Sequence, residues 1–65
     1  MRLRQLRRSR ELSQAELGKR LGLPRSSIAK YEKGLTQPRL EDARAIAKFF
    51  GEPIETVFDF VQVAS

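Results

Sequence analysis

The sequence has no cysteine, no histidine and no tryptophan among its 65 residues. Without cysteine, neither a disulfide nor a thiolate metal site can stabilise the fold. Without histidine or cysteine, and without a glycine-rich phosphate loop, the usual constellations of nucleophile, base and metal ligands cannot be assembled. We therefore expect a protein that is not an enzyme and that holds no cofactor and no metal.

Long hydrophobic runs are also missing. The N-terminal stretch MRLRQLRRSREL carries five arginines and no apolar run, which excludes a secretory signal or a membrane span there. We expect an intracellular, cytoplasmic protein that does not enter a membrane. A chain of 65 residues forms one domain in which apolar burial is marginal, so oligomerisation is the remaining way to stabilise it.

Charge is unevenly distributed along the chain. Residues 1–39 hold eleven Lys and Arg against three Glu, a net charge of +8, whereas residues 40–65 hold two against five, a net charge of −3. A basic half of this kind is typical of a surface that binds a polyanion. The alternative is a set of solvated arginine-rich helices, and charge alone does not separate the two.

Residues 14–21 have the pattern of a short amphipathic helix. Ala15, Leu17 and Leu21 mark its apolar face, and Ser13 with Glu16 forms the S-x-x-E capping box that opens a helix.

A second helix is predicted over residues 25–33, with Ile28 and Tyr31 inward and Gly34 as its C-terminal stop. The glycine-containing turn at residues 22–24 joins the two helices as in a helix-turn-helix, whose second helix enters a DNA major groove. Gly18 fits this arrangement, because a helix that crosses close to its neighbour has little room for a side chain.

Further helices are expected before and after this pair. The first spans about residues 2–11 with Leu3 and Leu6 inward, and the last short one runs from Pro53 to about Val57. A loop at residues 35–39 precedes a helix over residues 40–50, whose buried stripe is Leu40, Ala43, Ile46, Ala47 and Phe50. The tail from Val57 to Val63 alternates like a strand, and a frayed apolar tail is the other interpretation.

Together these segments resemble the Cro/C1-type (Xre-family) helix-turn-helix DNA-binding proteins over about residues 3–58. The similarity lies in LSQAELGKRLGL (residues 12–23), SSIAKYEKG (26–34), LEDARAIAKFFG (40–51) and PIETVF (53–58). It implies an all-α, five-helix bundle of the lambda-repressor-like type over residues 1–58. Residues 59–65 would then be a C-terminal tail that forms a short dimerisation strand in one of the two interpretations.

The resemblance also implies roles for particular residues. Base-edge candidates are Arg25, Ser26, Ser27 and Lys30, and phosphate candidates are Arg7, Gln14, Thr36, Gln37 and Arg39. In the family the residues matching Arg7 and Glu32 form a pair, and the residue matching Gln14 also braces the recognition helix. Chemistry supports the base-edge set independently, since Arg and Lys donate to guanine and hydroxyls pair with several bases. The alternatives are a solvated helix face for Arg25 and Lys30 and helix-start chemistry for the two serines.

Two positions depart from the family pattern. Pro24 stands where the family usually has a Ser or Thr that caps the recognition helix, and Leu35 stands where a polar loop residue is common.

The sequence therefore predicts a sequence-specific regulator, a repressor that binds double-stranded DNA as a homodimer on an inverted repeat. The expected dimer interface is Pro53 to Val63, with Ile54, Val57, Phe58, Phe60 and Val61 as its apolar candidates, and the 40–50 helix with Phe49 as the next choice. The alternative function is a protein-interaction module, such as the antitoxin or co-regulator half of a two-component pair.

Overall fold

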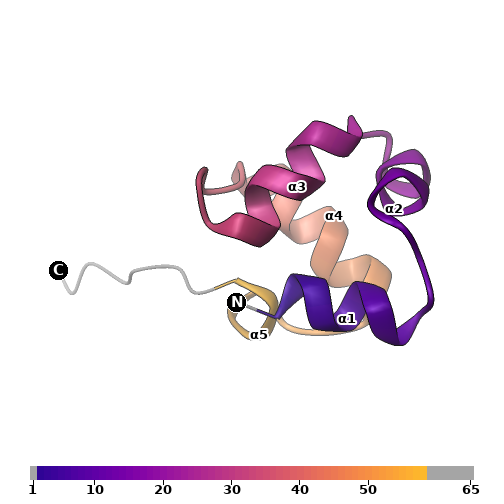
Figure 1. The fold of residues 1–65 in the computed structure, drawn as a ribbon. Helices are drawn as coiled ribbons and strands as arrows, with labels where there is room; N and C mark the ends of the chain where they lie inside the picture. The colour runs from indigo at the N-terminus through magenta and orange to yellow at the C-terminus, as the bar shows by residue number, and fades with distance from the viewer. Residues whose placement is uncertain (1, 59–65) are drawn as a thin grey trace, which may run out of the picture.

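The computed structural model describes residues 2–58, which form five α-helices and no strand within that range (Figure 1). The helices are α1 (Leu3–Ser9), α2 (Gln14–Leu21), α3 (Arg25–Lys33), α4 (Leu40–Phe50) and α5 (Ile54–Val57). Figure 1 shows α2 and α3 at one end, α1 and α5 at the other, and α4 between them. The all-α, five-helix prediction is confirmed, and so are the predicted bounds of α2, α3 and α4. None of the helices in the described range is long and apolar enough to cross a bilayer.

Helix α1 is shorter than the sequence predicted. We expected it to reach Glu11, but it ends at Ser9, and Glu11 adopts a left-handed backbone with φ of 55°. The amides of Arg10 and Glu11 donate to carbonyls three residues earlier, on Arg7 and Arg8. This tightening of the last turn turns the chain away from the helix axis before α2 begins.

One hydrophobic core joins all five helices. It contains residues from every helix and from the segment just after α5, and its buried members are Leu3, Leu17, Ile28, Tyr31, Ala43, Ile46, Ala47, Phe50, Val57 and Phe58. Leu6, Leu12, Leu21, Leu23, Phe49 and Ile54 pack around it. The apolar periodicity of the sequence identified most of these positions correctly.

Two residues expected in the core lie on the surface. Ala15 is exposed because a step of about 100° per residue places it on the side of α2 opposite to Leu17. Leu40 is 58% exposed. It is the first residue of α4, and because helical side chains lean toward the N-terminus, it extends off the end of the helix rather than into the core.

Arg10 fastens the end of α1 to the end of α4. Its guanidinium lies over the rings of Phe49 and Phe50, at 5.6 and 5.3 Å from the ring centroids. The same group donates a hydrogen bond of 3.3 Å to the carbonyl of Phe50, in the last turn of α4. A cation at this position complements the negative end of the helix and covers a half-buried aromatic ring.

The C-terminal end of the described chain belongs to the core. Val57 closes α5 and accepts a hydrogen bond of 3.1 Å from the amide of Arg2, which joins the two ends of the domain. The expectation that the strand-like alternation begins at Val57 is therefore wrong, because this residue is helical. Phe58 has an extended backbone but is not part of a strand, and the rest of the predicted strand, with the tail of residues 59–65, lies outside the described residues.

Tyr31 connects α3 to the first turn of α4. Its ring meets Phe58 edge to face, with centroids 6.4 Å apart, and its hydroxyl donates a hydrogen bond of 2.9 Å to the Asp42 carboxylate. Burial, together with the bond to Asp42 and the negative charge of that carboxylate, raises the pKa of Tyr31. The neutral phenol therefore stabilises the fold below the ordinary tyrosine pKa of about 10, and this contribution is lost as the pH rises through the higher folded value.

Asp42→Asn is expected to lower the pKa of Tyr31 while leaving it above the ordinary value, because burial is the larger cause of the shift. Tyr31 is the one tyrosine in a chain without tryptophan, so ultraviolet absorbance during an alkaline titration follows this phenol alone. The matched control is Glu55→Gln, which neutralises an exposed carboxylate on α5 and should leave the midpoint unchanged. An unchanged midpoint in Asp42→Asn would contradict the bond between Tyr31 and Asp42.

Candidate nucleic-acid interface

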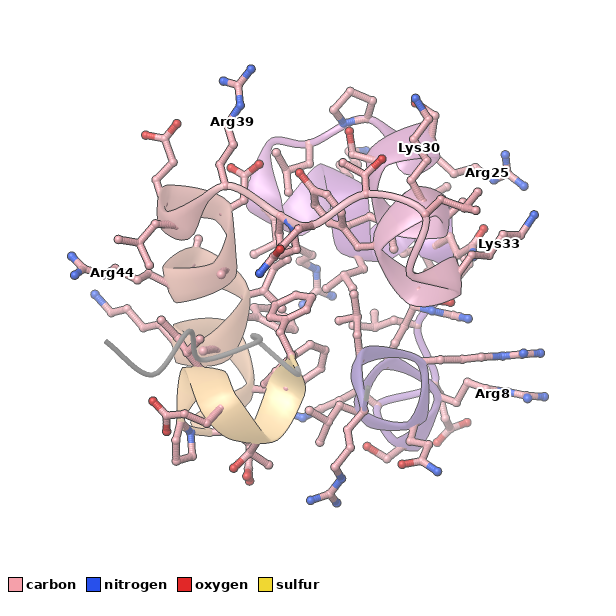
Figure 2. All side chains as sticks on the ribbon, turned by 90° about the vertical axis from the view of Figure 1, so that its left-hand side faces the viewer. Arg8, Arg25, Lys30, Lys33, Arg39 and Arg44 are labelled. Carbon is pink, nitrogen blue, oxygen red and sulfur yellow. The ribbon has the colours of Figure 1, made fainter. Side chains whose placement is uncertain are left out.

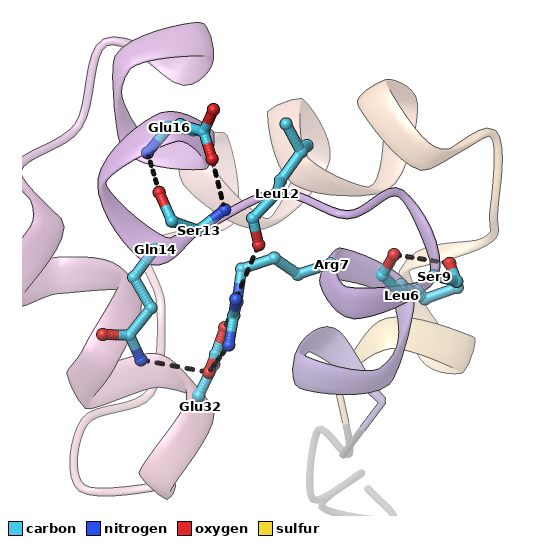
Figure 3. A network of polar contacts seen from close by, with 8 residues as sticks. All are labelled: Leu6, Arg7, Ser9, Leu12, Ser13, Gln14, Glu16 and Glu32. Atoms are coloured by element: carbon cyan, nitrogen blue, oxygen red, sulfur yellow. Dashed lines mark hydrogen bonds and ion pairs between the residues drawn. The ribbon is translucent and has the colours of Figure 1, made fainter.

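The α2–turn–α3 unit positions the candidate site. The Ser13 hydroxyl accepts a hydrogen bond of 3.0 Å from the Glu16 amide, and the Glu16 carboxylate accepts one of 2.8 Å from the Ser13 amide (Figure 3). The hydrogen bond from the Ser13 amide, and after it the Ser13 hydroxyl, lower the pKa of the Glu16 carboxylate, so the capping box weakens as the pH falls through that lowered value. The predicted capping box is confirmed, and it fixes the start of α2.

Gly18 sets how closely the turn approaches α2. A Cβ placed on Gly18 would lie 2.5 Å from the carbonyl oxygen of Leu23, which belongs to the turn backbone and cannot move aside like a flexible side chain. The amide of Leu23 donates to the Gly18 carbonyl at 2.8 Å, and Gly22 supplies the left-handed residue that ends α2. The expectation that Gly18 marks a close crossing is confirmed.

Helix α3 presents three of its four base-edge candidates to solvent. Arg25, Ser26 and Lys30 are exposed, whereas Ser27 is half-buried. Ile28 and Tyr31 face the core from the other side of the helix. In Figure 2 the long side chains of Arg25, Lys30 and Lys33 extend away from the bundle on the same side of the molecule.

The recognition helix begins without a side-chain cap. Pro24 occupies the N-cap position with an extended backbone and offers no side-chain hydrogen bond, and α3 starts at Arg25 as predicted. The amide of Ser27 donates to the Pro24 carbonyl at 3.0 Å. The other end is closed by Gly34 in the left-handed conformation, so α3 is fixed more firmly at its C-terminal end.

Three helices meet at the Glu32 carboxylate (Figure 3). From α1, the Arg7 guanidinium donates to both carboxylate oxygens, at 2.6 and 3.2 Å, and also to the Leu12 carbonyl at 2.7 Å. From α2, the side-chain amide of Gln14 donates to Glu32 at 3.1 Å. The side chains of Arg7 and Glu32 are only 12% and 4% exposed. Both the expected pairing of Arg7 with Glu32 and the bracing of α3 by Gln14 are confirmed.

A small hollow of about 210 Å³ opens over this network. Arg4 and Lys33 line it together with Arg7, Gln14 and Glu32. Lys33 was not among the residues that the sequence proposed for phosphate contact, and Arg4 was not singled out from the other arginines of the first helix, which could approach phosphate or stay solvated. The signal that could have found them is helical spacing, since Arg4 lies one turn before Arg7, and Lys33 lies beside the residue to which Arg7 is paired.

The loop after α3 places the remaining phosphate candidates. Thr36, Gln37 and Arg39 are exposed, while Pro38 between them is buried and holds the loop against the core. Figure 2 shows Arg39 extending outward at the same end of the molecule as Lys30. Leu35, at the start of the loop, is 72% exposed.

Two of the five residues expected at a dimer interface are core residues instead. Val57 is fully buried and Phe58 is 1% exposed, so neither offers a surface to a second copy. The expectation failed because Val57 and Phe58 belong to the hydrophobic core, where the Phe58 ring meets that of Tyr31. Ile54 is half-buried against the core, and Phe60 and Val61 lie outside the described residues.

Acidic groups in the described part of the chain are scattered. Residues 2–58 bring together no group of three or more carboxylates that could hold a metal ion. The polar features of this surface are therefore exposed cations, hydroxyls and amides around α3, which are the groups that pair with phosphates and base edges.

Comparison with known proteins gives the same picture. A helix-turn-helix family model matches residues 3–57. An HTH-type transcriptional regulator of Methanocaldococcus jannaschii, described as uncharacterised, is 45% identical over 56 residues, which are 86% of this chain and 85% of that protein. The cryptic phage CTXphi transcriptional repressor RstR of Vibrio cholerae is 40% identical over 52 residues, which are 80% of this chain.

The lengths of the relatives differ. This chain spans 47% of the Vibrio cholerae repressor and 26% of the HTH-type transcriptional activator BcrR of Enterococcus faecalis, which is 38% identical over 53 residues. No solved structure matches the chain. The similarity thus covers the helical domain, and some relatives carry additional sequence.

Because Arg7 and Glu32 are both largely buried, removing either one leaves the other charge without its partner. We expect Arg7→Ala and Glu32→Ala each to lower the free energy of unfolding by about 3 kcal/mol. The decrease in the free energy of unfolding of the double variant should be clearly smaller than the sum of the two single decreases. Urea denaturation at low temperature measures all three values. Arg8→Ala, which truncates an exposed arginine on the same helix, is the control and should change stability by less than about 0.5 kcal/mol. Strict additivity would contradict the pairing.

Proposed function

This chain belongs to the Cro/C1-type (Xre) family of helix-turn-helix DNA-binding transcriptional regulators, and we propose that it is a sequence-specific repressor that binds an inverted-repeat operator as a homodimer. The observation that carries the proposal is the exposed face of α3. Arg25, Ser26 and Lys30 extend from a helix whose opposite face is packed into the core and whose C-terminal end is held by Glu32. A rigidly held helix with exposed donors is what reading of a major groove requires.

The base-reading roles follow from side-chain chemistry. Arg25 can donate two parallel hydrogen bonds to the O6 and N7 atoms of guanine, and Lys30 can donate to the same edge as a point charge. The hydroxyl of Ser26 donates or accepts and so pairs with several bases. Ser27 is half-buried and lies beside these residues, where it can contact a base or support the first turn of α3.

Backbone contacts surround this reading surface. On one side lies the hollow with Gln14, Arg7 and the newly identified Arg4 and Lys33; on the other lies the loop with Thr36, Gln37 and Arg39. Since most of the Arg7 guanidinium is used to hold Glu32, we assign the stronger phosphate contacts to Arg4 and Lys33. Phosphate contacts on both sides of α3 would fix its register in the groove.

Repression is the proposed outcome because the Vibrio cholerae relative, at 40% identity, is named a transcriptional repressor. A protein that covers a promoter prevents transcription without any further contact. A reporter gene placed under the selected operator tests this directly, and increased transcription in the presence of the protein would overturn it.

A second candidate function is a protein-interaction module, such as the antitoxin or co-regulator half of a pair. The 72% exposure of Leu35, next to the candidate DNA surface, is the observation that favours it. Co-purification tests this function. A second protein that co-purifies with the original chain in fixed stoichiometry, but not with the Leu35→Ser variant, would support it.

Arg25→Ala is expected to weaken binding to the operator by about 1 to 3 kcal/mol and to relax the preference at one position in each half-site, because a base-edge contact is lost. Arg39→Ala, an exposed arginine on the loop, is the matched control and should weaken all sequences alike. Selection of bound DNA from a random pool measures both effects. If Arg25→Ala lowered affinity uniformly and left the preferred sequence intact, Arg25 would be a phosphate contact.

Binding should also depend steeply on salt. With Arg4, Lys33 and Arg39 on phosphates in both subunits, log K should fall with log salt by about 5, at about 0.9 for each neutralised phosphate. Arg39→Ala should reduce that slope by about 2 for the dimer, and Arg2→Ala, which removes an exposed charge just before α1, should leave it unchanged. A nearly flat salt titration would count against DNA as the ligand.

A further inference from the structure

Leu35 is an exposed apolar residue to which the DNA contacts described above give no role. It is 72% exposed, and among residues 2–58 the other exposed large hydrophobic residue is Leu40, at 58%. Burial stabilises a leucine in proportion to the apolar area that it removes from water, so Leu35 adds little to the stability of the domain. Its side chain is therefore free to contact another molecule.

The way α3 ends fixes the position of Leu35. The amide of Gly34 donates to the carbonyl of Tyr31 at 3.2 Å, and the amide of Leu35 donates to the carbonyl of Lys30 at 3.1 Å. With Gly34 in the left-handed conformation, these two bonds form a Schellman motif, which folds the chain back against the last turn of the helix. Leu35 is thereby held next to Lys30, one of the residues proposed to contact base edges.

The loop beyond Leu35 stays on the same surface. Pro38 is buried and holds the loop against the core, whereas the residues before it are exposed. Figure 2 shows the Arg39 side chain extending outward at the same end of the molecule as Lys30. Leu35 therefore lies in a segment whose two ends carry a proposed base contact and a proposed phosphate contact.

The charges near this leucine favour a polyanion as its partner. Residues 30–39 contain three exposed cations, Lys30, Lys33 and Arg39. Their one acidic residue, Glu32, is paired within the domain, and its side chain is only 4% exposed. A second copy of this chain would bring its own cations to the same place and would be repelled. The surface around the leucine is thus better suited to DNA than to another basic protein.

One group in the major groove of DNA is suited to an apolar side chain. Every base pair presents hydrogen-bond donors and acceptors there, and thymine also presents a methyl group on C5. A leucine side chain neither donates nor accepts a hydrogen bond, so placing it against a polar base edge would remove water without replacing the lost bonds. The thymine methyl is therefore the group on a base edge that a leucine can contact favourably.

We propose that Leu35 is a specificity-determining residue that contacts the C5 methyl group of one thymine in each half-site. This inference rests on the proposed function, because it requires α3 to lie in the major groove. It adds an apolar contact to the hydrogen bonds proposed for the polar side chains of α3.

The test removes the methyl group from the DNA as well as the side chain from the protein. In a duplex that carries one half-site selected by the full chain, deoxyuridine replaces thymine at one position at a time. Deoxyuridine lacks only the C5 methyl and keeps every hydrogen-bonding group of the base. At one position the replacement should raise the Kd of the original chain about fourfold, which is the effect of one buried methyl group. Leu35→Ala should bind both duplexes equally at that position, about as weakly as the original chain binds the deoxyuridine duplex.

Two variants serve as controls. Leu35→Met keeps a long apolar side chain and should still prefer thymine over deoxyuridine at that position. Leu40→Ala removes the other exposed leucine and should keep both the affinity and the preference of the original chain. The bond from residue 35 to the Lys30 carbonyl uses a backbone amide, which alanine and methionine retain. Circular dichroism of each variant reports whether it is folded.

The possible results separate this inference from the proposed function. If no thymine of the half-site shows a methyl effect that depends on Leu35, although the chain selects a sequence, only the contact of Leu35 is wrong. A Leu35→Ala variant that binds DNA normally but no longer retains a co-purifying protein would overturn the inference in favour of a protein contact. If the original chain selects no DNA sequence at all, the proposed function is wrong and this inference is wrong with it.

Discussion

The position of the recognition helix depends on one buried carboxylate. Glu32 accepts hydrogen bonds from Arg7 on α1 and from Gln14 on α2. A single side chain of α3 thus fixes the positions of three helices relative to one another. Its side chain is only 4% exposed, and a carboxylate so placed is costly unless its charge is paired and its oxygens are bonded. Any movement of α3 relative to α1 and α2 would break these bonds. Hydrophobic packing holds the helices together, and the polar network around Glu32 fixes the orientation of α3 relative to α1 and α2.

Packing imposes a second constraint, which acts at the turn. The carbonyl of Leu23 lies where a Cβ on Gly18 would stand, so the turn between α2 and α3 has no free space on that side. In a domain of this size a few such contacts determine how the helices are arranged, because the core is small and closely packed. Tyr31 then ties the same helix to Asp42 on α4. Helix α3 is consequently held from α1, α2 and α4 at once.

Much of the fold could be predicted because its signals are local. The capping box at Ser13 and the stop at Gly34 depend on neighbouring residues and on backbone conformation, and both were placed correctly. The failures concern features that depend on distant parts of the chain. Whether Val57 and Phe58 are buried depends on how α5 packs onto the rest of the core, and the exposure of Leu40 depends on where α4 begins relative to that core.

The candidate site also combines features that depend on neighbouring residues with features that depend on distant parts of the chain. Arg25 and Lys30 were proposed from the resemblance to the family, and the structure shows both exposed on a helix whose Ile28 and Tyr31 are buried. Arg4 and Lys33 were not singled out because they come together only after α1 has packed beside α3, and their spacing from Arg7 and Glu32 becomes informative only once that pair is known. The role of Gln14 in bracing α3 came from the resemblance to a family, since its partner Glu32 lies eighteen residues further along the chain.

The two ends of α3 are held to different degrees, which bears on how it would read DNA. Its C-terminal half carries Tyr31 and Glu32, which are fixed by the core and by the polar network, and it ends at Gly34. Its N-terminal end has Pro24 in place of a capping side chain, and its first residues, Arg25 and Ser26, are exposed. The anchored half sets the angle at which the helix enters a groove, while the less constrained end carries side chains that can adjust to base edges. Accurate placement and local adaptability are thus provided by different turns of one nine-residue helix.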